Sequence, residues 1–145
     1  MIDALTAELG ELVAGATGLA TSIDPIRPPQ IPGCFVGPPS MSPDPETGGR
    51  VLIVQWELGA LVVAKVGAWE LAARLGEQIA AAVTAHATYG LVGARSSLYP
   101  QADAGDAPGY RIDVAILLLA GDLVALDPVT LTAELDAGAT ERITP

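Results

Sequence analysis

The strongest constraint on the fold is a helical pattern between Ala68 and His86. Polar residues recur there every three or four positions, and apolar residues occupy the opposite side of the same stretch. The polar stripe consists of Glu70, Arg74, Glu77 and Gln78, and the apolar stripe consists of Trp69, Ala72, Leu75, Ile79, Ala82 and Val83. The pattern predicts an amphipathic helix that packs on a core, with Trp69 as its anchor.

A second amphipathic helix is predicted over residues 2–17, where apolar residues are again spaced by three and four, and it ends near Gly18. Residues 23–33 contain four prolines and predict a stiff, extended connector. A short strand is predicted at 34–36. Residues 38–49 are rich in Pro, Ser, Asp and Gly, which predicts a long mobile loop.

Residues 50–58 alternate between a wholly apolar side and a half-polar side, which predicts a strand that could continue beyond a break at Gly59. Trp56 lies on the apolar side and is expected in the core. Two more extended segments follow, and they predict a β-hairpin with a long turn. The strands of this hairpin are expected at 91–99 and 110–120, and the turn at 100–109.

The C-terminal stretch fits two structures. Asp127-Pro128 resembles a helix start, whereas residues 129–135 alternate between apolar and polar side chains, and we favour the strand. The order of elements predicts an α+β fold, a mostly antiparallel β-sheet with two helices packed on one face. Residues 1–121 are expected to form a single α+β domain, and residues 122–145 a C-terminal extension of it.

Charge and composition exclude several classes of protein. The 145 residues include 7 basic and 17 acidic side chains, for a net charge of −10, and the basic residues are scattered singly. A basic surface that binds the phosphate backbone of a nucleic acid is therefore not expected. No signal peptide or membrane-spanning segment is predicted. The single Cys and single His exclude a disulfide framework and a multi-histidine metal site within one chain.

Few residues suggest catalysis. Cys34 and His86 could form a nucleophile and base, but an apolar strand and a helix end favour structural roles. Asp103 and Asp106 could share a calcium ion, although a solvated turn is the simpler interpretation. Lys65 could form a Schiff base, but a lysine at a strand-to-helix junction is expected to face solvent. We therefore expect no enzyme activity and no catalytic, cofactor-binding or metal-binding residues.

The last strand of the predicted hairpin is apolar on both faces. Leu117 and Leu119 lie opposite Val114, Ile116 and Leu118. Either helices cover both faces of this strand, or a second chain covers one of them. The second possibility predicts an oligomer or an assembly component.

The chain resembles the tail terminator, or tail completion, proteins of long-tailed, non-contractile bacteriophages. The resemblance lies in the order of elements over residues 1–120 and in the segment Pro32-Gly-Cys-Phe-Val-Gly-Pro-Pro-Ser40, which is similar to the strand end of that family. A hairpin whose last strand opens with Tyr110 completes the likeness. Residues 122–145 have no counterpart in this resemblance.

The resemblance implies a structural virion protein without cofactors. It would form a homo-oligomeric ring, usually of six subunits, at the head-proximal end of the tail tube, where it stops tube growth and offers a docking face to the head connector. Its partners would be its own copies, the tail tube protein and the head–tail connector, with assembly in the host cytoplasm. DNA would pass through the lumen without specific binding, and no membrane would be involved.

Interface residues are expected in the two Pro/Gly-rich loops and on the uncovered strand face. They are Pro38, Pro39, Ser40, Met41, Asp44, Glu46, Arg50, Asp103, Asp106, Leu117 and Leu119. Two alternatives remain open at this point: a neighbouring neck component, such as a head–tail joining or head-completion protein, and a small non-enzymatic binding domain.

Overall fold

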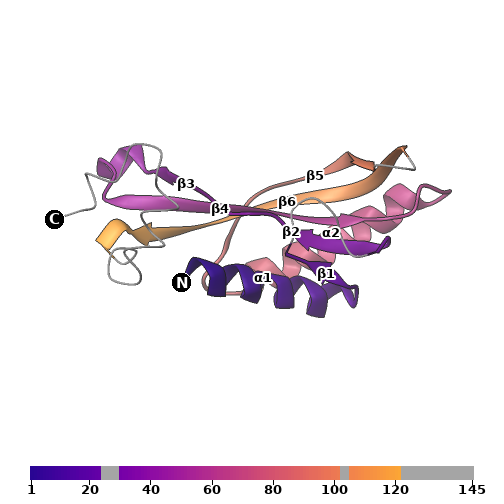
Figure 1. Cartoon of the computed structure of the whole chain (residues 1–145), viewed down its shortest axis with the longest axis horizontal. Helices are drawn as coiled ribbons and strands as arrows, with labels where there is room; N and C mark the ends of the chain where they lie inside the picture. The colour runs from indigo at the N-terminus through magenta and orange to yellow at the C-terminus, as the bar shows by residue number, and fades with distance from the viewer. Residues whose placement is uncertain (24–29, 102–104, 122–145) are drawn as a thin grey trace. The chain divides into compact units, whose positions relative to one another are not determined.

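The computed structural model describes residues 1–23, 30–101 and 105–121 (Figure 1). The chain divides into two compact units. Unit 1 contains Met1, residues 41–54 and the chain from Leu117 onward, and unit 2 contains residues 2–40 and 55–116. The predicted strand at 129–135 and the turn residue Asp103 lie outside the described residues.

The strands form one six-stranded sheet in the order β1-β2-β4-β6-β5, and β3 pairs with β4 beside this path. The bounds are β1 Thr21–Ser22, β2 Gly33–Val36, β3 Ser40–Pro43, β4 Val51–Leu61, β5 Gly90–Gln101 and β6 Gly105–Leu119. β1 pairs with β2 in parallel, whereas the β2–β4 and β5–β6 pairs are antiparallel. β5 is therefore an edge strand.

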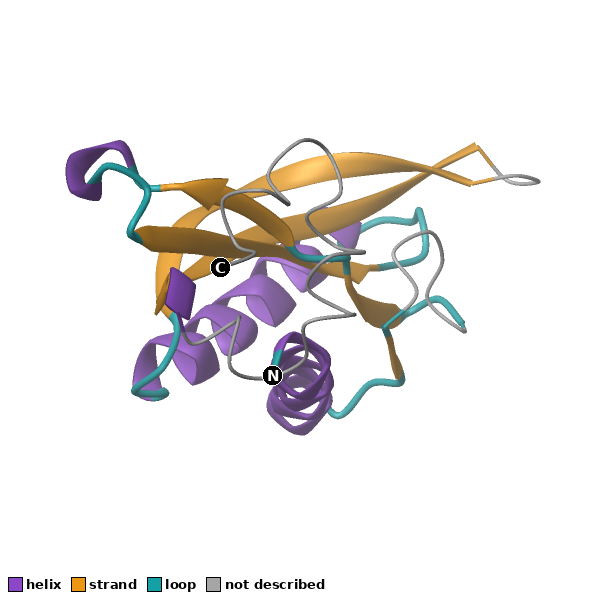
Figure 2. Ribbon diagram, turned by 60° about the vertical axis from the view of Figure 1, so that its left-hand side comes forward, coloured by secondary structure: helices purple, strands orange, loops and turns teal. Residues whose placement is uncertain are grey.

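Both predicted helices are present in unit 2, as α1 (Ile2–Thr17) and α2 (Ala68–Ala85). They contact one another and lie on the same face of the sheet (Figure 2). The α+β prediction, with a mostly antiparallel sheet and two helices on one face, is confirmed. α2 ends because His86 adopts an extended backbone with φ −85° and ψ 134°.

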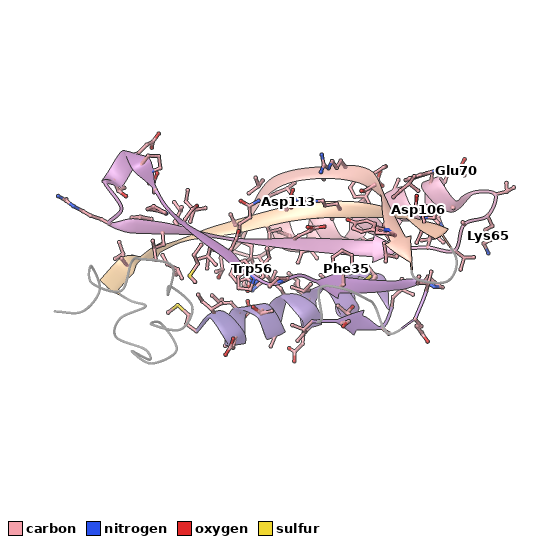
Figure 3. All side chains as sticks on the ribbon, turned by 45° about the horizontal axis from the view of Figure 1, so that its top comes forward. Phe35, Trp56, Lys65, Glu70, Asp106 and Asp113 are labelled. Atoms are coloured by element: carbon pink, nitrogen blue, oxygen red, sulfur yellow. The ribbon has the colours of Figure 1, made fainter. Side chains whose placement is uncertain are left out.

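The core of unit 2 forms between the helices and the sheet. Trp56 is fully buried there, as predicted from its strand face, and lies between β4 and α1 in Figure 3. Its indole Nε1 donates a hydrogen bond to Thr6 Oγ1 at 2.9 Å, and that hydroxyl donates to the carbonyl oxygen of Ile2 at 2.9 Å. The polar atom of the largest buried side chain is thereby satisfied within α1.

The prediction of Trp69 as a core anchor is wrong. Its side chain is 45% exposed, and the buried face of α2 is formed by Ala68, Ala72, Leu75, Gly76, Ile79 and Val83. Gly76 lies on this face because the ring of Tyr110 on β6 occupies the space that a Cβ would need. The helix packs closely at a glycine, which leaves the tryptophan beyond the edge of the contact.

The predicted loop at 38–49 is also wrong, because it contains the strand β3 and the short 3₁₀ helix η1 (Pro45–Thr47). Asp44 organises the segment. Its carboxylate accepts from the backbone N–H of Glu46 at 3.2 Å, while its own N–H donates to the carbonyl of Val51 at 2.9 Å. Gly48 then takes a left-handed conformation, with φ 65°, that ends the turn.

The prediction of a long turn at 100–109 is also wrong. β5 runs to Gln101 and β6 starts at Gly105, so most of these residues belong to strands. The carbonyl of Pro108 accepts a hydrogen bond from the Val62 N–H at 2.9 Å. A Cβ on Gly109 would lie 2.6 Å from the Ala60 carbonyl oxygen. These two residues therefore serve close packing beside β4, although their types are typical of a turn.

Candidate interaction surface

The residues with potential chemistry do not converge on one site. Cys34 is buried, and its Sγ lies 3.5 Å from Thr17 Oγ1, whereas His86 pairs with Glu8. Lys65 is exposed in the turn before α2, where its carbonyl accepts from the N–H of Ala68. Within the described ranges, no group of three or more His, Cys, Asp or Glu side chains is arranged to hold a metal ion. No helix in this part of the chain has the length and apolar character to cross a membrane.

Burial raises the pKa of the Cys34 thiol above its ordinary value, with hydrogen bonding to Thr17 opposing the shift only in part. A raised pKa lowers the thiolate fraction at a given pH, and the thiolate is the reactive form. We expect Ellman's reagent at pH 8 to modify native Cys34 at least about tenfold more slowly than the same chain in denaturant. Equal rates in the two states would contradict this assignment of Cys34 to the core.

His86 belongs to a network that fastens α1 to the start of β5. Its Nε2 lies 3.3 Å from Glu8 Oε1, and its Nδ1 accepts from the backbone N–H of Thr88 at 3.2 Å. Tyr89 donates to the same Glu8 oxygen at 2.8 Å. The Tyr89 ring meets Trp56 edge-on, with ring centroids 6.2 Å apart. Through these contacts His86, Glu8 and Tyr89 connect α1 with the residues that precede β5.

A second cluster forms on the sheet face away from the helices. Phe35 on β2 lies over Gly59 on β4, and its ring meets Tyr99 on β5 edge-on at 5.5 Å between centroids. Leu61 and Ala107 are buried in the same cluster, and Ile31 packs against it. The sheet thus has a small second core opposite the helices.

A polar group adjoins this second core. Glu57 accepts a hydrogen bond from the Tyr99 hydroxyl at 3.4 Å and lies 3.7 Å from Arg111 Nη1. The Arg111 Nε donates to Asp113 Oδ1 at 3.1 Å. Burial, and then the Glu57 carboxylate, raise the pKa of Tyr99 well above its ordinary value, so the phenol stays neutral. The arrangement supplies fixed charge and hydrogen bonds but no activated nucleophile.

The edge strand β5 is the most exposed long element of unit 2. Leu98 is 54% exposed, and Val92 and Leu91 are also exposed apolar side chains on this strand. Arg95 lies directly opposite Arg111 in the β5–β6 register. Arg111 has two carboxylate partners, whereas no ion pair of Arg95 is found among the described residues. Neither Arg95 nor Leu98 is among the interface residues predicted from the sequence.

The predicted interface residues fall into both units. In unit 1, Met41, Asp44, Glu46 and Arg50 belong to the segment that includes η1 and the approach to β4. The Ala120 N–H donates to the carbonyl of Arg50 at 3.0 Å, which brings this segment beside the end of β6. Leu117 and Leu119, on that end of β6, are 66% and 58% exposed.

In unit 2 the predicted interface residues lie at separate positions. Pro38, Pro39 and Ser40 follow β2, and the Ser40 hydroxyl donates to the carbonyl of Gln55 at 3.5 Å. Asp106 is exposed near the tip of the β5–β6 hairpin. The role of all these residues in an interface stays a prediction.

A scan of known protein families and a search of curated proteins find no match to this chain.

Proposed function

We propose that the chain is a structural virion protein that forms a ring at the head-proximal end of a phage tail tube. There it ends tube polymerisation and provides the docking face for the head connector. The observation that carries the proposal is the pair Leu117 and Leu119, which stay exposed at the end of a strand whose Val114 and Ile116 are buried. Two large exposed leucines on one strand face suit a surface that another protein covers.

Two further observations support an assembly role. The two helices occupy only one face of the sheet (Figure 2), which leaves the other face available for contacts with another chain. The net charge of −10 suits a ring around DNA, because an acidic lumen repels the phosphate backbone and so lets it slide. A ring also needs a heterologous contact, in which two different surfaces of each subunit meet.

The test replaces both leucines by glutamate, as Leu117→Glu with Leu119→Glu, in a host that produces tails. We expect tails that are overlong or lack heads, because charges on the contact face oppose docking of the ring. The control is Val66→Glu, which places one carboxylate on a fully exposed loop valine of the other unit. Tail length is measured by electron microscopy, and folding by the thermal midpoint of each purified variant.

Normal tails from the double variant, with the folded protein present, would contradict the proposal. A protein that binds head connectors but leaves tube length unchanged would instead indicate a neck component.

A further inference from the structure

The free edge of β5 has backbone groups ready to pair with another strand. Pro108 has no N–H, and its carbonyl points toward β4, where it accepts from the N–H of Val62 at 2.9 Å. Leu98 lies directly opposite Pro108, so the backbone N–H and C=O of Leu98 point away from β6. By the alternation of an antiparallel pair, Ala94 and Ser96 also present their backbone groups to the free edge.

Among the described residues, no strand pairs with this edge of β5. A register shift between Leu91 and Gly93 interrupts it at one end, and Pro100 blocks it at the other. Residues 94–99 between them contain no proline, and most of them are exposed. Six residues is about the length of an ordinary strand, and an unprotected edge of this length is a template for strand addition.

The two faces of this segment differ in chemistry. Ser96 lies opposite Tyr110, whose ring contacts Gly76 of α2, so Ala94, Ser96 and Leu98 are on the helix side. Arg95 and Ser97 are on the other side, together with Arg111. A strand that fits this edge is therefore apolar on the helix side and polar, with a carboxylate near Arg95, on the other.

Residues 129–135, Val-Thr-Leu-Thr-Ala-Glu-Leu, have this pattern and lie outside the described residues. In an antiparallel register that sets Glu134 opposite Arg95, Thr132 falls opposite Ser97 and Leu131 opposite Leu98. The chain from 122 to 145 carries five carboxylates and one arginine, which complements an arginine that lacks a partner in the described part. We propose that residues 129–135 of a neighbouring copy add to the free edge of β5 as an antiparallel strand.

The chain is too short to make this pairing with its own β5. In the proposed register Thr130 lies opposite Tyr99, which itself lies opposite Ala107. β6 from Ala107 to Leu119 extends about 40 Å at roughly 3.3 Å per residue. The chain from Leu119 to Thr130 reaches at most about 40 Å when fully extended. In this register no residues are left to cross β5 and reverse direction, so the proposed pairing uses a second copy.

Such an exchange is heterologous, because the C-terminal segment of one copy meets the β5 edge of the next. A contact of this kind propagates around a ring. The inference rests on the proposed function for the closure of that ring, but the strand pairing itself is tested separately.

The test uses the full chain with Ser97→Cys and Thr132→Cys. These residues would form a pair without backbone hydrogen bonds, with Cα atoms about 4.5 Å apart, which lies within the range that a disulfide spans. Under mild oxidation at millimolar chain concentration, we expect a reducible ladder of dimers and higher oligomers on a denaturing gel. The matched control, Ser97→Cys with Ala133→Cys, points its second thiol to the opposite face and should yield at least about tenfold less ladder.

A disulfide within single chains would overturn the proposal in favour of pairing in the same copy, and the absence of any disulfide would also overturn it. Rings on tail tubes without a ladder would leave the proposed function standing while this inference falls. A ladder together with unchanged tails from the Leu117 and Leu119 double variant would support the strand pairing and contradict the proposed function.

A second pair of variants removes backbone donors. Ser96→Pro deletes an N–H that faces the free edge, so it should leave the thermal midpoint near that of the wild type and weaken association at least about tenfold. Ser97→Pro deletes an N–H directed at β6 and should lower the thermal midpoint instead. Unchanged association of the folded Ser96→Pro variant, measured by sedimentation velocity, would overturn the proposal.

Discussion

Replacing Trp56 by alanine is expected to lower the free energy of unfolding by about 3–5 kcal/mol. The side chain is fully buried, so its removal leaves a large cavity between β4 and α1. The substitution also removes the donor to the Thr6 hydroxyl and the edge-on contact with the Tyr89 ring. A chain of 145 residues has only about 5–15 kcal/mol of stability, so the variant should lose a large share of it.

Urea denaturation followed by circular dichroism measures this effect. Trp69→Ala is the matched control, because it removes the same side chain from a position that is 45% exposed. It should cost less than about 1 kcal/mol, since exposed substitutions away from special features have small effects. Similar losses for the two variants would contradict the placement of Trp56 in the core and Trp69 outside it.

Replacing Gly76 by alanine is expected to destabilise the protein by about 1–3 kcal/mol, although alanine is the better helix former. The added Cβ would overlap the ring of Tyr110, which lies on β6 and packs against α2. Relief would require α2 to move from the sheet or Tyr110 to leave its rotamer, and both changes disturb the packed face.

Gly15→Ala is the matched control for this prediction. Gly15 is also a helix residue, in α1, but no atom lies within 4 Å of the position of its added Cβ. This control should therefore raise stability by about 0.5–1 kcal/mol. Opposite signs of the two shifts in the urea midpoint would support the contact between α2 and Tyr110. The double variant Gly76→Ala with Tyr110→Ala should recover part of the loss attributed to the overlap, which a double-mutant cycle measures.

The proposed strand exchange relates the exposed edge to the proposed ring. An edge strand with outward backbone groups is a hazard for uncontrolled association unless something occupies it. A terminal segment of a neighbouring copy would occupy that edge and also determine which surfaces of two subunits meet. Pro100 and the irregularity at Leu91–Gly93 would limit the pairing to residues 94–99.

Sequence patterns identify some of the exposed residues of the candidate interaction surface and miss others. Leu117 and Leu119 are predicted as interface residues because a strand with apolar residues on both faces needs other elements or chains to cover each face. Both side chains are exposed, and their role in an interface stays a prediction. Arg95 could not be selected in this way. Its position opposite Arg111 depends on the register of β5 and β6, which neither strand defines alone.

The sequence by itself determined the two helices, the strand predicted at 50–58 and the α+β class, while the structure extends that strand to Leu61. These elements depend on local periodicity. A helix shows apolar residues every three or four positions and a strand shows them at alternate positions, and both patterns are contained in the sequence of the element itself. Only the tertiary structure decided that Trp69 is exposed and that Pro108 and Gly109 belong to a strand. Their placement depends on how closely α2 approaches Tyr110 and β6 approaches β4, and such distances arise from residues far apart in the chain.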